Sequence, residues 1–259
     1  MLFVHENNLK NKIATNYKNK KEELKEFYEN VYLEVKRKLL EIEFVDDNDD
    51  NFKKAAEIIN NYYNELDKFS AKHKITSQSK FRSTFLEEIS TYLFVDNKYI
   101  KEEQLGIYNR KIYEGIKIGN NLKVSIIKKD VDFCIGKKVH MTIENKKYEI
   151  ILPIIAVEVK TYLDATMFGE VQFSSRLLKN ATPSVKAYIL METNRVALDK
   201  VRATRNDTVL EEMFVLRLNV SSPIDYKVLK AYYLQISNDI KDISIEKEIK
   251  IPGRLINID

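Results

Sequence analysis

The sequence has 259 residues, 44% of them hydrophobic and 32% charged, which excludes a disordered chain and fits a folded globular protein. It contains no run of about 18 apolar residues and no secretory signal, so we expect a cytoplasmic protein without a membrane partner. A net charge of +4 permits a polyanionic partner without requiring one, and the six glycines form no phosphate-binding loop.

The first part of the chain is predicted to be helical from residue 10 to residue 73, with a break at 46–51. Each helix carries an apolar stripe at helical spacing, formed by Leu24, Phe27, Val31, Leu39 and Ile42 and then by Phe52, Ala56, Ile59, Tyr63, Leu66 and Phe69. Such a pair predicts an antiparallel hairpin. We interpret residues 1–75 as a helical N-terminal region with a structural or dimerising role, and direct DNA contact through its lysines is the alternative.

A third helix is predicted over residues 79–95. At 100° per residue its apolar stripe is centred on Phe85. Glu88 lies at the edge of this stripe, whereas Glu87 points away from it. We therefore expect Glu88 to reach into a cleft and Glu87 to face solvent.

The periodicity changes to that of strands near residue 122. Strands are predicted over 123–136, 138–144 and 148–160, with a hairpin turn at 144–147, and later over 185–192 and 212–218. Helices are predicted over 161–181 and from Ser222, with Ser222 as N-cap, Pro223 in the first turn and Asp225 as a capping carboxylate. The order predicts an α/β fold with a mixed central sheet flanked by helices, in a domain spanning residues 76–259 that ends in a C-terminal helix.

Two charged residues interrupt the apolar strand IIAVEVK. Glu158 and Lys160 are two apart, so their side chains leave the same face of the strand. Asp132 projects opposite to its apolar neighbours Phe133 and Ile135. Its carboxylate, on another strand, can therefore face Glu158 and Lys160. Two carboxylates without histidine or thiol partners are hard oxygen ligands that suit Mg²⁺ and its bound water. A metal site would offset the cost of removing these charges from water.

An Asp followed by Glu-x-Lys is the signature of the PD-(D/E)xK nucleases. The 26 residues from Asp132 to Glu158 leave room for one hairpin. Similar triplets at 34–36, 144–146 and 248–250 lie in a charged helix, in a turn and near the terminus. Only the triplet at Glu158 combines a buried strand, an upstream Asp on another strand and a following helix.

Longer segments extend this match. VDFCIG, AVEVKTYLDATM, LLKNATP and an upstream LEE resemble the type II restriction endonucleases of the BbvCI group, over roughly residues 80–190. The resemblance implies a restriction-endonuclease-like core in a prokaryotic enzyme that hydrolyses double-stranded DNA at a short specific sequence with Mg²⁺. It also implies roles for the matching residues: metal ligation by Asp132, Glu158 and the carbonyl of Val159, positioning of water by Lys160, and support from Glu88. Val131 replaces the proline of the signature.

DNA recognition is expected outside this cluster. The loop between the last two predicted strands offers Arg195, Lys200, Arg202 and Arg205 for contacts with guanine edges or phosphates, although a solvated loop is an equal alternative. Glu170 is interpreted as an exposed helix position. The resemblance implies either a homodimer or a heterodimer with a related nuclease subunit.

Two other functions remain open at this point. One is a DNA repair or recombination nuclease of the same superfamily, and the other is a non-catalytic DNA-binding protein that kept the fold. Cys134 has apolar neighbours and is expected to be buried rather than nucleophilic. The three histidines, at positions 5, 73 and 140, lack the spacing of a zinc site.

Overall fold

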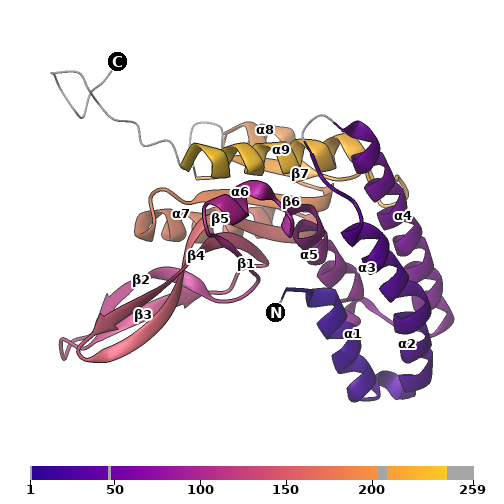
Figure 1. Ribbon diagram of the computed structural model, residues 1–259, viewed down its shortest axis with the longest axis horizontal. Helices are drawn as coiled ribbons and strands as arrows, with labels where there is room; N and C mark the ends of the chain where they lie inside the picture. The colour runs from indigo at the N-terminus through magenta and orange to yellow at the C-terminus, as the bar shows by residue number, and fades with distance from the viewer. Residues whose placement is uncertain (1, 46–47, 204–208, 244–259) are drawn as a thin grey trace.

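Figure 1 shows a computed structural model of the chain, which describes residues 2–45, 48–203 and 209–243. The α-helices are α1 Val4–Ala14, α2 Lys21–Phe27, α3 Leu33–Leu40, α4 Asp49–Lys72, α5 Phe81–Phe94, α6 Lys98–Glu102, α7 Ala165–Ala181, α8 Leu198–Ala203 and α9 Tyr226–Ile243. The strands are β1 Gly106–Tyr108, β2 Ile112–Ile118, β3 Val124–Lys129, β4 Phe133–Ile143, β5 Lys146–Leu163, β6 Lys186–Asn194 and β7 Glu212–Val215. No helix in these ranges is long and apolar enough to cross a membrane.

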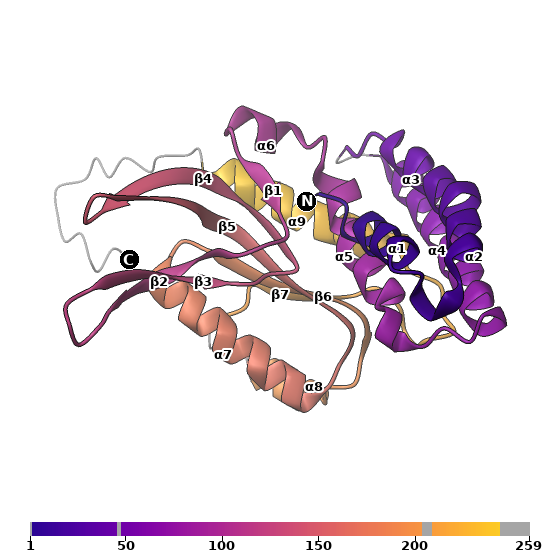
Figure 2. The same cartoon turned by 90° about the horizontal axis from the view of Figure 1, so that it is seen from below.

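The central sheet is mixed, as predicted. Its strand order is β1-β4-β5-β6-β7, in which β1, β4 and β5 pair antiparallel and β5, β6 and β7 pair parallel. One face packs through Val157, Val159 and Leu190 against α5 and α9, and the other packs through Ala156 and Ile189 against α7. Figure 2 shows α7 and α9 on opposite sides of the sheet. Alternate burial along β5 therefore places residues 158 and 160 on the face away from α9.

The β4–β5 hairpin follows the predicted turn. Glu144 and Asn145 have φ values of 47° and 63°, and Ile143 pairs with Lys146 across a two-residue loop. Two positive φ angles are typical of the tight turn that matches strand twist, and Asn tolerates this conformation well.

The predicted strand 123–136 differs from the structure. It is two strands, β3 and β4, separated by residues 130–132, and β3 pairs with β2 in a two-stranded sheet of its own. Periodicity alone cannot show this break, because the residues on both sides alternate in the same way and only the pairing partners differ.

The N-terminal helices form the predicted hairpin. The helix from 21 to 40, with a π-helical turn at Tyr28–Tyr32, packs against α4 through buried residues of both stripes. The structure adds α1, which packs on α5 and was not predicted as a separate helix. The apolar core is continuous from these helices through α5 to the sheet and α9. The division between residues 75 and 76 stays a prediction.

Helix α9 begins later than predicted. Asp225 is its capping residue, because its Oδ1 accepts a hydrogen bond from Lys227 N at 2.8 Å, so the predicted N-cap at Ser222 is wrong. The segment before it is held in extended form by distant partners, since Asn60 Oδ1 accepts from Ile224 N at 2.8 Å. These long-range bonds displace the local start signal at Ser222.

A buried carboxylate joins α1 to α5. Glu88, which has no exposed surface, accepts hydrogen bonds at its Oε2 from His5 N at 2.8 Å and Glu6 N at 3.2 Å. Its Oε1 accepts from Tyr32 OH at 2.7 Å and Tyr92 OH at 2.5 Å. The first N–H groups of a helix lack partners within the helix, and its N-terminus favours a negative charge. Glu88 therefore caps α1 from a neighbouring helix.

Removing this charge should destabilise the fold. In Glu88→Gln, an amide donor faces N–H and O–H donors that lose their acceptor, so we expect the free energy of unfolding to fall by about 3 kcal/mol. Urea unfolding measures this difference. The adjacent Glu87→Gln, which leaves the network intact, should change it by less than about 1 kcal/mol. Equal losses in the two variants would contradict the capping role.

Acidification should reveal the buried histidine beside this network. Burial lowers the pKa of His5 from 6.5 to about 3, so the unfolded chain takes up a proton in this interval that the folded protein rejects. Its contribution to stability is complete above pH 6.5 and is lost as the pH falls, by about 1.4 kcal/mol per pH unit. His5→Gln should show a shallower decrease of unfolding free energy between about pH 6 and pH 4. An unchanged slope in urea titrations would rule out a neutral buried imidazole.

Candidate active site

The cluster forms where β5 extends past the start of β4. Phe133, the first residue of β4, pairs with Val157, so the backbone of β5 beyond this pair has no strand on that side. Asp132 fills the gap, because its Oδ2 accepts a hydrogen bond from Val159 N at 2.8 Å. The residue before β4 is thereby fixed to the strand that carries the other two charges.

The structure brings together the three residues predicted from the sequence. Lys160 Nζ lies 3.4 Å from Glu158 Oε2 and 3.7 Å from Asp132 Oδ2. The side chains of Lys160 and Asp132 are 30% and 28% exposed, and that of Glu158 is 17% exposed. The cluster is therefore partly exposed to solvent, unlike a closed buried ion pair.

A second lysine, which was not singled out from the sequence, completes the cluster. Lys129, the last residue of β3, places its Nζ 2.8 Å from Glu158 Oε1. Each oxygen of Glu158 thus faces one ammonium group. No sequence signal identifies Lys129 among the other lysines, because its contact depends on how the β2–β3 hairpin folds against β5.

These charges shift one another's pKa values. Burial opposes ionisation of Glu158, but Lys129 and Lys160 outweigh it and hold the pKa of this carboxyl below its usual value. Burial and the charge of Glu158 raise the pKa of Asp132, against the opposing effects of Lys160 and the N–H of Val159. Burial disfavours the charged form of Lys160, yet the two carboxylates raise its pKa. Lys160 therefore carries a positive charge at neutral pH.

Glu87 faces this cluster, contrary to the prediction that it lies in solvent. Burial and the nearby charge of Asp132 raise its pKa to about 8, with Lys160 opposing the shift. The predicted supporting residue, Glu88, instead points to the N-terminal helices. The helical projection reversed the two because α5 is buried on both sides, so the face opposite its main apolar stripe is not solvated.

The donor set fits a hard divalent cation. Asp132 and Glu158 offer carboxylate oxygens, and the N–H and C=O of a strand residue share an edge, so the carbonyl of Val159 lies on the side of Asp132. Within the described ranges no group of three or more His, Cys, Asp or Glu could hold a metal ion. Mg²⁺ needs only one or two carboxylates, since water and substrate oxygens complete its coordination.

The residues predicted to contact DNA are exposed where the structure describes them. The exposed guanidinium of Arg195 lies 4.4 Å from the ring centroid of Tyr162, while Lys200 and Arg202 are exposed on α8. Arg205 lies outside the described residues. The role of this set stays a prediction.

Two other predicted placements are confirmed. Glu170 is exposed on α7, so it does not join the cluster. Cys134 is buried without a disulfide partner, and burial raises the pKa of its thiol, which disfavours the reactive thiolate.

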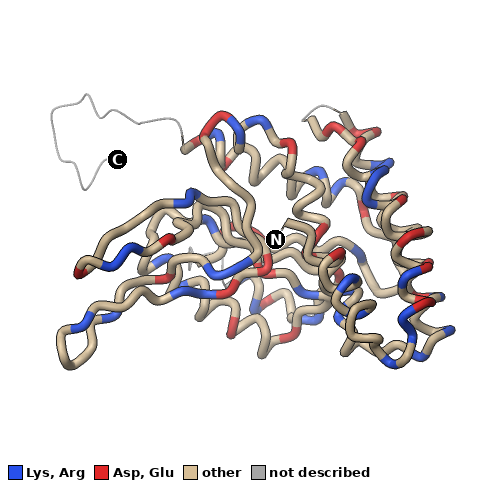
Figure 3. The backbone as a smooth tube through the Cα atoms, turned by 60° about the horizontal axis from the view of Figure 1, so that its bottom comes forward, with Lys and Arg blue, Asp and Glu red and all other residues tan. Residues whose placement is uncertain are grey.

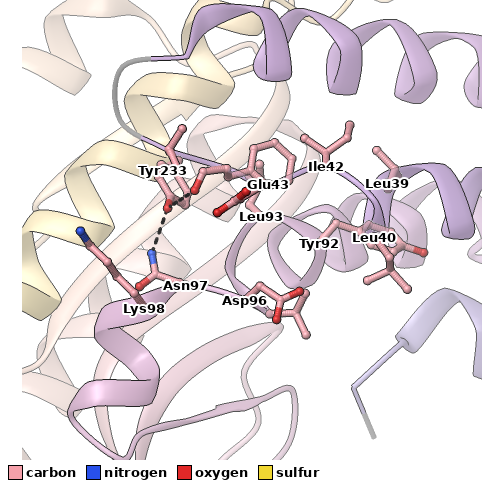
Figure 4. A pocket seen from close by; sticks show the side chains of 13 residues that line it. Leu39, Leu40, Ile42, Glu43, Tyr92, Leu93, Asp96, Asn97, Lys98 and Tyr233 are labelled. Carbon is pink, nitrogen blue, oxygen red and sulfur yellow. Dashed lines mark hydrogen bonds between the residues drawn. The ribbon is translucent and has the colours of Figure 1, made fainter.

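A cavity of about 360 Å³ lies away from the cluster, between the segment after α3, the end of α5 and α9 (Figure 4). Its buried polar groups bond to one another: Asn97 Nδ2 lies 3.3 Å from Tyr233 OH, which donates to Phe44 O at 2.8 Å. Its acids Glu43 and Asp96 are exposed. The polar lining thus serves packing between the helices and does not resemble a second reactive centre.

Comparison with known proteins identifies the fold and the family of the chain. A search of curated protein sequences gave no match. The solved structure described as "native BbvCI A2B2 tetramer at low resolution" superposes with a TM-score of 0.77 at 17% identity, covering 93% of this chain and 97% of that chain. This likeness shows a shared fold. The family model of the Bpu10I restriction endonuclease matches residues 78–235, more than half of the chain and the part that carries the cluster. The chain therefore belongs to the Bpu10I restriction endonuclease family, which confirms the resemblance read from its sequence segments.

Proposed function

We propose that this protein is a type II restriction endonuclease that uses Mg²⁺ to hydrolyse phosphodiester bonds of double-stranded DNA at a short specific sequence. The observation that carries the proposal is the meeting of Asp132, Glu158 and Lys160 at one solvent-accessible edge of β5. Membership in the restriction endonuclease family supports the same activity. A nuclease that acts in repair or recombination would use the same cluster, and it differs in recognising DNA structure rather than sequence.

Each residue of the cluster has a distinct role in this proposal. Asp132, Glu158 and the carbonyl of Val159 hold Mg²⁺, which supplies positive charge beside the phosphate when it is bound. Lys160 orients a water molecule through its ammonium hydrogens, so that the water oxygen attacks phosphorus while the bond to the leaving sugar oxygen breaks. Glu87 adds a carboxyl group whose raised pKa allows proton exchange near neutral pH.

The remaining charges of the cluster suit a phosphodiester. The ammonium group of Lys160 can stabilise the negative charge that develops on the phosphate oxygens, and Lys129 lies in the same cluster. Arg195, Lys200 and Arg202, together with Arg205, remain the proposed contacts with bases or backbone elsewhere on the duplex.

Cleavage of both DNA strands requires two such clusters. One chain contributes a single cluster, so we propose an assembly of two or more nuclease chains, either a homodimer or a heterodimer with a related subunit. The similar BbvCI structure is described as an A2B2 tetramer, which supports an oligomeric assembly.

Plasmid digestion tests the proposed chemistry. Wild-type protein with Mg²⁺ should give discrete fragments, and EDTA should abolish them. Lys160→Ala should lower the cleavage rate by about a hundredfold or more, because the attacking water loses its orienting group. Lys38→Ala, which removes an exposed lysine of α3, is the matched control and should cut normally. Equal cutting by Lys160→Ala would reject the site, and fragments without a common sequence would favour a repair nuclease.

A second digestion distinguishes the two adjacent glutamates. Glu87→Gln should slow cleavage by about tenfold to a hundredfold while the protein unfolds at a normal urea concentration, because it alters a group beside the metal ligands. Glu170→Gln makes the same change at an exposed position of α7 and should leave the rate unaltered. A normal rate in Glu87→Gln would show that α5 contributes no working carboxylate.

A further inference from the structure

The β2–β3 hairpin stands out as an arm beside the active site. Its two strands pair only with each other, and Figures 1 and 2 show them extending from the body of the protein. We call residues 112–129 the β2–β3 ribbon. Its inner end is fixed, because Lys128 Nζ donates to Glu149 O at 3.0 Å and Lys129 Nζ pairs with Glu158. The outer end carries the turn around Leu122.

Positive charge is concentrated on this arm. Residues 112–129 contain four Lys and one Glu, a net charge of +3 in a chain whose net charge is +4. The rest of the sequence is therefore close to neutral on balance. Figure 3 shows blue Lys and Arg positions along the two projecting hairpins together with some red Asp and Glu positions, and both colours along the N-terminal helices. A basic strip of this kind is the footprint of a polyanionic partner.

In the part of the chain that the structure describes, two lysines of the ribbon lack the acidic partners that several lysines of the N-terminal helices have. Lys117 and Lys123 are exposed, and no carboxylate of the described residues pairs with either of them. On the N-terminal helices, by contrast, lysines pair with acids one turn away, as Lys53 does with Asp50 at 2.8 Å and Lys68 with Glu65 at 2.8 Å. The charge of the ribbon is thus available for an external ligand.

Lys117 lies on the face of the ribbon that is directed toward the cluster. Ser125 and Lys129 leave the same face of β3, and Lys117 is opposite Ser125 in the register. Lys117 therefore shares the face on which Lys129 reaches Glu158. Six residues of strand separate Lys123 from Lys129, a span of about 20 Å. Along a DNA strand this corresponds to about six nucleotides.

We propose that the β2–β3 ribbon is a DNA-binding arm, in which Lys117 and Lys123 contact backbone phosphates up to about six nucleotides from the scissile phosphate. The inference rests on the proposed function and adds a contact surface to it. A two-stranded ribbon fits the major groove of B-form DNA, where its edges meet the phosphates. Lys129 places the base of the ribbon at the catalytic cluster.

The exposed apolar side chains of the ribbon suggest an alternative partner to DNA, a second copy of the chain. Ile116 and Ile118, which are 47% and 65% exposed, lie on the face opposite Lys117 and could contact a second copy of the chain. A two-fold contact would bring together two ribbons that each carry a net positive charge, and like charges repel. Charge complementarity therefore favours DNA.

Binding without cleavage tests the ribbon separately from catalysis. Fluorescence anisotropy of a duplex of about 30 base pairs in EDTA, over about 50 to 200 mM NaCl, gives the dissociation constant and its salt dependence. Lys117→Ala with Lys123→Ala should weaken binding about tenfold or more and reduce the salt slope by about 2. The control, Lys54→Ala with Lys72→Ala, removes the same charge from exposed positions of α4 and should bind within about twofold of wild type.

Each result has a definite meaning. Wild-type affinity in the ribbon variant, or an equal loss in the α4 control, overturns the inference while the proposed nuclease function stands. Wild-type protein that neither binds nor cuts duplex DNA overturns both. If the ribbon variant binds normally but Ile116→Ser with Ile118→Ser changes the sedimentation coefficient, the arm joins copies of the chain and the inference fails.

Discussion

The hydrogen bond from Val159 N to Asp132 Oδ2 is the constraint on which the active site depends. A strand that outlasts its neighbour leaves backbone groups without partners, and leaving such a group unsatisfied costs about 1 to 3 kcal/mol when it is buried. Asp132 satisfies the first of these groups with its side chain. The same bond sets the aspartate beside Lys160 and on the edge that carries the Val159 carbonyl. The same hydrogen bond therefore extends the pairing of the strands and positions the residues of the cluster.

Helix α5 connects the cluster to the N-terminal helices and to the rest of the sheet. On one side its Glu88 caps α1, and on the other its Glu87 faces the cluster. One turn earlier, Arg82 donates to the buried Glu192 of β6 at 2.9 Å and to Asp67 of α4 at 3.0 Å, which ties α5 to the sheet and to the N-terminal helices. A buried pair with several hydrogen bonds holds geometry well even where its net stabilisation is small. The N-terminal helices thus fix the position of a carboxylate in the site without touching it.

The distribution of charge separates two parts of the surface. Several lysines of the N-terminal helices pair with acids three or four residues away, whereas Lys117 and Lys123 of the β2–β3 ribbon have no acidic partner among the described residues. Lysines without acidic partners destabilise the fold little on an arm that extends into solvent, where the repulsion between like charges is screened. It produces a local positive field next to the cluster, where we propose that a DNA backbone binds.

The sequence by itself determined what short-range periodicity and turn chemistry control. Alternation along β5 placed Glu158 and Lys160 on one face, and the Glu144–Asn145 turn fixed the hairpin that brings β5 back beside Asp132. The mixed sheet and the meeting of these three side chains were therefore predicted correctly. Only the tertiary structure decided the contacts that depend on what packs against each element. Helix α5 is covered on both sides, which selects Glu87 over Glu88, and the docking of the ribbon selects Lys129 from many lysines. The residue pattern of one sequence indicates whether a segment is a helix or a strand. It does not indicate which neighbouring element will pack against each face.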